Sequence, residues 1–393
     1  MNYVRMPIEI ESPEQMGYDK VRYNLTESSL SDARLRDLMP DLGLEQALRD
    51  LVLCYGDHRG KQALRQLIAD EASQTSAPHA LGPLSPEDVL ITAGAAAALF
   101  IVATTLLDRG DHLLVVRPNY ATNIETPRAL GAEISYLDLR FEDGFGLDVD
   151  RLAAGLRPRT RLISLTTPHN PTGMVVPPDA LNQILALAEA RDAYLLIDET
   201  YREMAFANVP APFALHSPRV ISVSSLSKTY GLPGIRLGWL LCRDAALQER
   251  FLAAKEQIFI TNSVVDEEIA LRYLQGRAQH LPAIRDHIRS HFQIVRDWMA
   301  SPDTAALLEW VQPQGGVVCF PRIRDPRITG VDVDAFYRIL NDRYGTFVGP
   351  GHWFEQDRRH MRIGFGWPTT ADLRTGLSHV VSALRDAQVG TRA

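Results

Sequence analysis

From about residue 85, short apolar runs rich in valine, isoleucine and leucine alternate with longer segments of helical periodicity. Six runs, each bounded by glycine, proline, asparagine or serine, predict buried strands: Val89–Thr92, His112–Val116, Leu162–Leu165, Tyr194–Ile197, Val220–Val223 and Trp239–Cys242. Ala95–Leu107 and Ala180–Ala190 predict helices between them. This alternation is typical of an α/β domain with a mostly parallel central sheet flanked by helices.

The pattern changes after about Arg277. Three further helices are predicted around the short run QGGVVCF: Ile284–Met299, Ala335–Tyr344 and Ala371–Ala387. These features indicate a second, smaller α+β domain. We expect a large domain over residues 45–275 and a small domain built from residues 1–44 and 276–393, with Gln275–Pro282 as the candidate linker.

Length and composition agree with this division. The chain has 393 residues and 46% apolar content, which is enough for two lobes because single cores stop growing at roughly 250–300 residues. Its net charge of −7 is spread along the chain without basic blocks. We therefore expect a small-molecule ligand, and neither nucleic acid nor a membrane as partner.

The three cysteines lie far apart and outside any metal-binding spacing, which predicts reduced thiols and a cytoplasmic location. The N-terminal residues carry acids where a signal peptide has an apolar run. His287 and His291 lie four residues apart on a predicted helix but lack the glutamate of an HExxH motif. We expect them to be solvated, and we predict no metal site.

Polar residues follow each of the first five predicted strands. In order, they are Gly94-Ala95-Ala96, Pro118-Asn119-Tyr120, His169-Asn170-Pro171-Thr172-Gly173, Asp198-Glu199-Thr200-Tyr201 and Ser224-Ser225-Leu226-Ser227-Lys228. Open α/β sheets bind ligands beyond the carboxyl ends of their strands. One crevice could therefore collect all five groups.

Lys228 is the most informative of these residues, because an amine at a strand end can form a Schiff base with a carbonyl cofactor. Taken alone, such a lysine is more often structural or exposed. Here Ser225 and Ser227 supply hydroxyl groups, and Arg236 supplies a rigid fork suited to a phosphate. A ligand with both a phosphate and an aldehyde suggests pyridoxal 5′-phosphate.

The ordered motifs resemble those of fold-type I pyridoxal-phosphate enzymes, and among them the class I/II aminotransferases. The likeness runs from about Tyr55 to Arg362 and includes an SxSK…GxRxG segment. It implies that Lys228 holds the cofactor and that Ser225 and Arg236 bind its phosphate. The reaction implied is ping-pong transfer of an amino group from an L-amino acid to a 2-oxo acid.

The same resemblance assigns roles to residues with plainer alternatives. Asp198 could cap a helix, but in the family it pairs with the pyridinium nitrogen. Asn170 could be only a turn residue, but the family uses it and Tyr201 on the cofactor's phenolic oxygen. Tyr120 could be a packed aromatic, but the family stacks a ring on the cofactor from this position.

Main-chain groups are expected to complete the phosphate site. Gly94, Ala95 and Ala96 open a predicted helix, whose free N–H groups favour an anion. Tyr55, in the pattern Y-x4-G-x3-LR, corresponds to a family residue that reaches the phosphate of the neighbouring subunit. The resemblance thus implies a homodimer with shared active sites.

Three residues are expected to bind substrate: Asn170, which also serves the cofactor, Arg362 and Glu27. A lone Arg362 would usually form a surface ion pair, but the family's arginine at this position in MRIGFG grips the substrate α-carboxylate. The segment YNLTES stands where many aminotransferases have a glycine-containing loop. It could be a polar loop leading into a helix. Alternatively, Glu27 within it faces the substrate and favours an arginine-like side chain.

The altered YNLTES segment leaves other reactions open, because the fold and cofactor do not select the chemistry. A lyase, cyclase or oxidase acting on an arginine-like or other amino acid is the main alternative. A third hypothesis is an aminotransferase-like transcriptional regulator. The residues before Tyr55 are few and not basic, which disfavours a DNA-binding module there.

Overall fold

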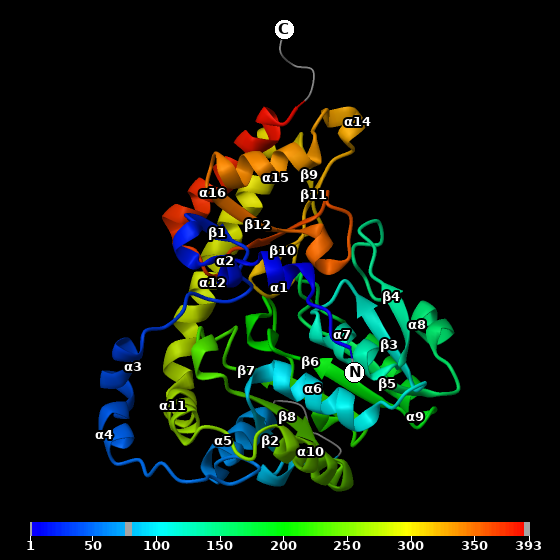
Figure 1. The fold of residues 1–393 in the computed structure, drawn as a ribbon, viewed down its shortest axis with the longest axis vertical. Helices are drawn as coiled ribbons and strands as arrows, with labels where there is room; N and C mark the ends of the chain where they lie inside the picture. The colour runs from blue at the N-terminus through cyan, green and yellow to red at the C-terminus, as the bar shows by residue number, and fades with distance from the viewer. Residues whose placement is uncertain (1, 75–80, 389–393) are drawn as a thin grey trace.

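The computed structural model describes residues 2–74 and 81–388 and shows two lobes (Figure 1). The larger lobe occupies the lower half of the view and the smaller lobe the upper half. The long helix α12 (Arg277–Ala300) runs between them. No helix in the described ranges is long and apolar enough to cross a membrane.

The large lobe is built on a seven-stranded sheet. Its strand order is β2 (Val89–Thr92), β8 (Gly238–Cys242), β7 (Val220–Ser225), β6 (Tyr194–Asp198), β5 (Thr160–Thr166), β3 (His112–Arg117) and β4 (Glu133–Asp138). Only β8 is antiparallel to its neighbours. The six predicted strands are confirmed, and β4 is an addition. Sequence reasoning missed β4 because this edge strand mixes polar and apolar residues instead of forming a continuous apolar run.

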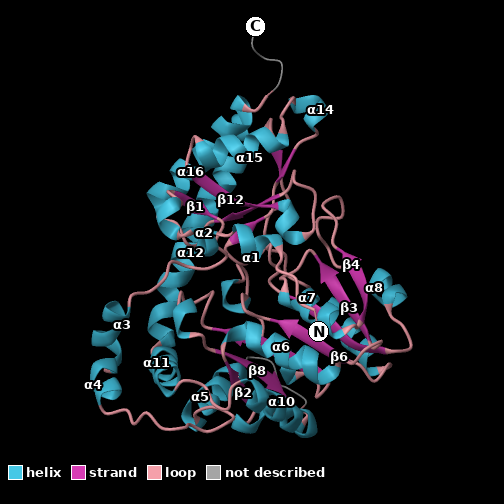
Figure 2. Ribbon diagram, in the orientation of Figure 1, coloured by secondary structure: helices cyan, strands magenta, loops and turns pink. Residues whose placement is uncertain are grey.

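Helices cover both faces of this sheet, as Figure 2 shows. They are α5 (Gln62–Ser73), α6 (Gly94–Leu106), α7 (Thr122–Leu130), α8 (Val149–Gly155), α9 (Pro178–Glu189), α10 (Ala245–Ile258) and α11 (Val264–Gln275). Successive strand residues point to opposite faces. Accordingly, Ile163 of β5 joins the cluster that contains Ile184 of α9, while its neighbour Leu162 packs with Val102 of α6. Both faces are apolar, which explains the continuous apolar runs.

The small lobe contains a four-stranded sheet in the order β1 (Tyr23–Leu25), β12 (Thr346–Pro350), β13 (Met361–Gly364) and β10 (Val318–Cys319). A two-stranded ribbon joins β9 (Leu308–Glu309) to β11 (Arg322–Ile323). Besides α12, the helices of this region are α13 (Pro302–Ala305), α14 (Pro326–Thr329), α15 (Val333–Asp342) and α16 (Thr370–Asp386). The first half of YNLTES is therefore a strand and not a polar loop, because it pairs in parallel with β12.

The remaining elements are short. Four helices lie in the N-terminal part of the chain: α1 (Pro7–Glu11), α2 (Pro13–Met16), α3 (Leu35–Leu42) and α4 (Leu44–Arg49). Turns of 3-10 helix lie in the loops: η1 (Tyr18–Lys20), η2 (Pro86–Asp88), η3 (Arg202–Met204), η4 (Phe213–Leu215), η5 (Pro233–Ile235) and η6 (Gly351–Phe354).

Two expectations about the start of the small lobe are wrong. Gln275–Pro282 is not an irregular linker, because only Gly276 separates α11 from α12. His287 and His291 are not solvated: their ring nitrogens bond to the carbonyl oxygens of Gly366 (2.9 Å) and Phe365 (2.7 Å). Both histidines thus fasten α12 to the segment after β13. The division into domains at residues 44/45 and 275/276 remains a proposal.

Candidate active site

A cavity of about 320 Å³ lies at the carboxyl ends of the large-lobe strands, with small-lobe and N-terminal residues on its other side. It collects most residues singled out from the sequence: Glu27, Ala95, Ala96, Tyr120, Asn170, Asp198, Tyr201, Ser225, Lys228, Arg236 and Arg362. Gly94 and Tyr55 are not part of its lining. The topology thus produces the single crevice expected from the strand ends.

Lys228 lies in the turn that follows β7. The backbone of this turn is anchored on both sides, because the Lys228 carbonyl accepts from Leu30 N (3.2 Å) and Leu226 N donates to Leu237 O (3.0 Å). Next to it, Thr229 Oγ1 donates to Thr200 O (3.3 Å) on the adjoining strand end. The amine is therefore held at the cavity by main-chain contacts that leave its side chain free to bind.

The start of α6 and Arg236 form an anion site. Gly94 has φ +82°, and a Cβ there would lie 2.6 Å from Arg236 Nη2. A Cβ on Gly238 would lie 2.6 Å from the Gly94 carbonyl carbon, so only glycine allows β8 to approach α6 this closely. The α6 N-terminus lacks a side-chain cap, which leaves its N–H groups for a ligand. Arg236 Nη1 also contacts Ser227 Oγ at 3.4 Å.

Asp198 ends β6 and is buried in the cavity wall. Its Oδ1 accepts from Thr200 N (3.0 Å) and Thr200 Oγ1 (2.6 Å), and no described residue bonds Oδ2. Burial raises the pKa of Asp198, while the Thr200 bonds and the charge of Lys228 lower it. A cation held against Oδ2 would favour the carboxylate form further. Asp198 is thus built to bind a protonated nitrogen.

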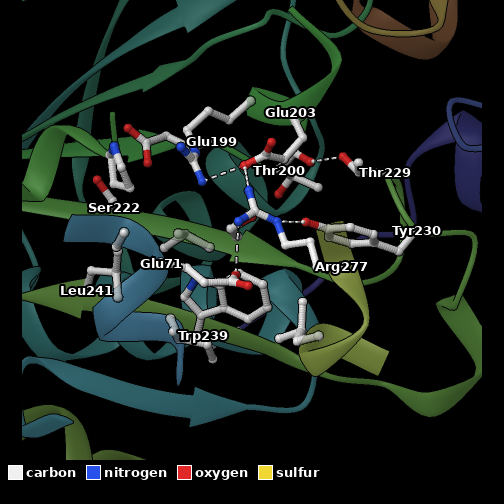
Figure 3. A pocket seen from close by; sticks show the side chains of 17 residues that line it. Glu71, Glu199, Thr200, Glu203, Ser222, Thr229, Tyr230, Trp239, Leu241 and Arg277 are labelled. Carbon is white, nitrogen blue, oxygen red and sulfur yellow. Dashed lines mark hydrogen bonds and ion pairs between the residues drawn. The ribbon is translucent and has the colours of Figure 1, made fainter. Parts of the chain in front are cut away.

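Glu199 points to the opposite face of the sheet, as the strand alternation requires. There it accepts from Phe213 N at 2.8 Å, and burial raises its pKa to about 7. Figure 3 shows the polar cluster on this side, around a cavity of about 30 Å³. Its centre is Arg277, which donates to Glu203 (2.6 Å) and to the Tyr230 hydroxyl (3.1 Å). This cluster ties the base of α12 to the turn after Lys228.

Arg362 of β13 enters the cavity from the small lobe and is only 5% exposed. Nη1 donates to Asn170 Oδ1 (3.1 Å) and Nη2 to Thr26 O (2.6 Å), and its face lies 5.0 Å from the Phe354 ring centre. Its buried Nε has no partner in the described part of the chain. A buried guanidinium with an unpaired donor favours an anionic ligand, such as a carboxylate.

Tyr201 and Tyr120 also line the cavity that Asp198 and Lys228 face. The Tyr201 hydroxyl donates to Ser28 Oγ (3.0 Å), and burial raises its pKa to about 12, so the phenol stays protonated and able to donate. Tyr120 is 41% exposed, as a ring facing an open cavity is expected to be. Its backbone N–H donates to Asn119 Oδ1 (2.7 Å).

Several residues of the site were not found from the sequence. Thr200 holds Asp198, Ser28 holds Tyr201, and Thr26 accepts from Arg362. The Asp-x-Thr spacing of Asp198 and Thr200 is a local hydrogen-bonding signal that could have revealed the first contact. The other two contacts join segments far apart in the chain, and spacing carries no information about them.

Tyr55 lies outside the cavity of its own chain and is 79% exposed. It belongs to an exposed apolar segment with Val52 (72%) and Leu53 (77%). Its role at a phosphate stays a prediction that requires a second subunit.

Residues 24–380 match the family model described as "Aminotransferase class I and II". The chain belongs to this family. Among curated proteins, this chain is 31% identical to arginine–pyruvate transaminase AruH of Pseudomonas aeruginosa, over 79% of this chain and 77% of that protein. It is 30% identical to capreomycidine synthase of Streptomyces vinaceus, over 91% of this chain and 88% of that protein.

A solved structure gives the same result. The aminotransferase superposes on a PLP-dependent aminotransferase from Streptococcus suis with a TM-score of 0.87 and 26% identity, covering 100% of both chains. The expected fold class, family and reaction are thereby confirmed: the protein is a fold-type I, pyridoxal-phosphate-dependent aminotransferase that moves an amino group from an L-amino acid to a 2-oxo acid. The site fits this cofactor, because an amine, a phosphate-sized anion site and a free carboxylate oxygen face one cavity.

Proposed function

We propose that the amino donor of this aminotransferase is an L-amino acid with a cationic side chain, of which arginine is the first candidate. The observation that carries the proposal is Glu27, a cavity-lining carboxylate that is 8% exposed. Its Oε1 accepts from the Tyr18 hydroxyl and from Asn24 Nδ2, both at 3.3 Å. These donors are neutral, so the charge of Glu27 lacks a cationic partner in direct contact.

The relatives support the same substrate class. The name of the Pseudomonas aeruginosa protein specifies arginine as donor and pyruvate as acceptor. Carried to this chain, arginine would place its guanidinium against Glu27 and its α-carboxylate against Arg362. The two charged ends of the donor would then each meet a charge of opposite sign in the one cavity.

We propose the following roles in the reaction. When bound, the cofactor supplies a carbonyl carbon for amine exchange and a ring that withdraws electrons from the donor Cα. Lys228 Nζ holds the cofactor at rest and accepts the proton that leaves Cα. Arg362 orients the donor so that this proton faces Lys228. Asp198 Oδ2 would bind the protonated ring nitrogen. Asn170 would donate to the phenolic oxygen, and so would Tyr201 once its single hydroxyl hydrogen turns away from Ser28 Oγ.

The phosphate would be held by Arg236, Ser225 and the N–H groups of Ala95 and Ala96, with Gly94 keeping the approach open. Tyr120 would stack on the ring. We propose that Tyr55 completes the phosphate site of a partner subunit in a homodimer, because its exposed apolar segment is suited to burial against a second chain. The free, exposed Cys54 supports a reducing, cytoplasmic location.

A second candidate reaction is favoured by one observation, the 30% identity to a synthase over 91% of the chain. Both reactions begin with loss of the Cα proton, so the cavity residues described above serve either. The difference lies in the fate of the donor: transamination converts it to an oxo acid and needs an acceptor for the next turnover, whereas the second reaction would turn over without an acceptor.

Incubation of the holoenzyme with single amino acids, without an acceptor, separates the two. We expect L-arginine to convert the cofactor to pyridoxamine phosphate with one equivalent of oxo acid, faster than any neutral donor. Repeated turnover without an acceptor, with release of ammonia or consumption of oxygen, would contradict transamination. Equal rates for basic and neutral donors would contradict the proposed substrate class.

A further inference from the structure

One wall of the active-site cavity is made by residues 6–16, here called the N-terminal segment. It contains the short helices α1 and α2, of which α1 contacts η6, and α1 lies between the two lobes in Figure 1. Ile8, Glu9, Ser12 and Glu14 of this segment line the cavity. None of them belongs to a motif found from the sequence.

The N-terminal segment is fixed in place by specific contacts. Glu11 Oε2 accepts from Trp353 Nε1 and bonds to His352 Nε2, both at 2.8 Å. Glu9 Oε2 accepts from Met6 N at 2.8 Å, and the Met6 and Pro13 side chains are buried. The wall is therefore tied to η6 of the small lobe, and Glu14 lies within it on α2.

Glu14 and Glu27 both line the cavity, close enough for the negative charge of Glu14 to act on Glu27. Burial raises the pKa of Glu27, and the negative charge of Glu14 raises it further. In the described part of the chain, neither carboxylate bonds to a lysine, arginine or histidine side chain, although the charges of Lys228 and Arg362 lower the pKa of Glu27 without direct contact. A second negative charge beside a buried carboxylate is unfavourable, and a cationic ligand between the two would relieve this repulsion.

We propose that Glu14 is a specificity-determining residue, which together with Glu27 binds the guanidinium end of the amino donor. The inference rests on the proposed function, and it adds the N-terminal segment to the substrate site. A guanidinium has five N–H donors in one plane, so it can bond to two carboxylates at once. Glu27 supplies the buried contact and Glu14 the contact at the cavity rim.

The test compares L-arginine with L-citrulline, in which a neutral urea of the same shape replaces the guanidinium. The measured quantity is the ratio of kcat/KM for arginine to that for citrulline in the half-reaction without acceptor. For Glu14→Gln, we expect this ratio to fall about tenfold, the effect of losing one partly exposed charge contact. For Glu27→Gln, we expect a fall of about a hundredfold, because that carboxylate is buried.

Asp19→Asn is the matched control, because Asp19 is an exposed acid close in sequence that does not line the cavity. It should leave the ratio unchanged. The double variant Glu14→Gln/Glu27→Gln should lose less than the product of the two single effects, since both residues bind one group. Unfolding midpoints of all variants check that the fold is retained.

Each outcome has one meaning. If no amino acid converts the wild-type cofactor, the proposed transamination fails. If the wild-type ratio is near one, the cationic donor fails. The wild type could prefer arginine while Glu14→Gln keeps that preference or lowers kcat/KM equally for both substrates. That result would refute only the role of Glu14 and leave the cationic donor standing.

Discussion

At the scale of single residues, the active site holds charges of both signs around one cavity. Arg236 and Arg362 supply positive charge where anions are expected, and Asp198 and Glu27 supply negative charge. Hydrogen bonds to uncharged groups hold Asp198, Arg362 and Glu27, so their charges stay available to a ligand. The geometry therefore favours a donor that carries both an anionic and a cationic end.

The raised pKa of Glu27 makes the preference for arginine depend on pH. A carboxyl group is charged above its pKa and neutral below it, so the arginine-to-citrulline ratio should fall as the pH decreases through the raised pKa of Glu27. The fall should begin at a higher pH than an exposed glutamate would give. Steady-state kinetics across the pH range measure this. In Glu27→Gln, the ratio should lose this dependence, and an unchanged profile would exclude Glu27 as the titrating group.

The choice of cofactor lysine is open to a direct test, because the chain has four lysines, Lys20, Lys61, Lys228 and Lys255, and only Lys228 lines the cavity. After borohydride treatment, the wild type should carry one cofactor attached to the peptide that contains Lys228. Lys228→Ala should carry none, and Lys20→Ala, an exposed control, should be labelled like the wild type. Mass spectrometry of the digests reads the result, and a label on another lysine would show that Lys228 is the wrong anchor.

At the scale of elements, the sequence predicts the large lobe well because its strands are buried on both faces and read as continuous apolar runs. β4 fails this rule as a partly exposed edge strand, and the antiparallel direction of β8 leaves no local mark in the chain. The linker expected at Gln275–Pro282 is absent from the structure, because α12 follows α11 with only Gly276 between them. Local propensity does not show whether two helices meet or a linker separates them.

The contact between α6 and Arg236 gives a prediction for Gly94→Ala. The added Cβ would lie 2.6 Å from Arg236 Nη2 at a φ of +82°, so the anion site must open. We expect the affinity for pyridoxal phosphate to fall at least about tenfold, the equivalent of about 1.4 kcal/mol. Pyridoxal, which lacks the phosphate, should bind nearly as it does to the wild type. Equilibrium titration of the apoprotein measures both.

Gly316→Ala is the control for the backbone effect alone. Gly316 also has a positive φ, of +78°, but no heavy atom lies within 4 Å of the added Cβ. This variant should pay the cost of the left-handed conformation in stability and keep its affinity for pyridoxal phosphate. Equal losses of affinity in the two variants would show that strain, and not the contact with Arg236, causes the effect.

At the scale of the whole molecule, the site is shared by parts of the chain that are distant in sequence. Lys228 and Asp198 come from the large lobe, Arg362 from the small lobe and Glu14 from the N-terminal segment. Motifs at strand ends could be recognised singly from the sequence. The contributions of Ser28, Thr26 and Glu14 could not, because each depends on how the N-terminal residues pack against both lobes.

A shared site between two subunits predicts complementation. Tyr55→Ala and Lys228→Ala should each lower the activity of the homodimer. In mixed dimers, one site combines an intact Lys228 with an intact Tyr55 from the partner subunit, so random mixing should restore about a quarter of the wild-type activity. Activity after co-expression or after unfolding and mixing measures this. Activity no higher than the average of the two separate variants would mean that Tyr55 does not act across subunits.

The parallel pairing of β1 with β12 has a consequence for the order in which the enzyme is assembled. β1 is synthesised before the strands of the large-lobe sheet, yet β12, the strand against which it lies, is synthesised after them. The large-lobe sheet can form during translation from strands that are close in sequence, whereas β1 and the N-terminal segment must wait for β12. The nascent protein would therefore complete its cofactor-facing wall first and gain its ability to discriminate among amino acids last.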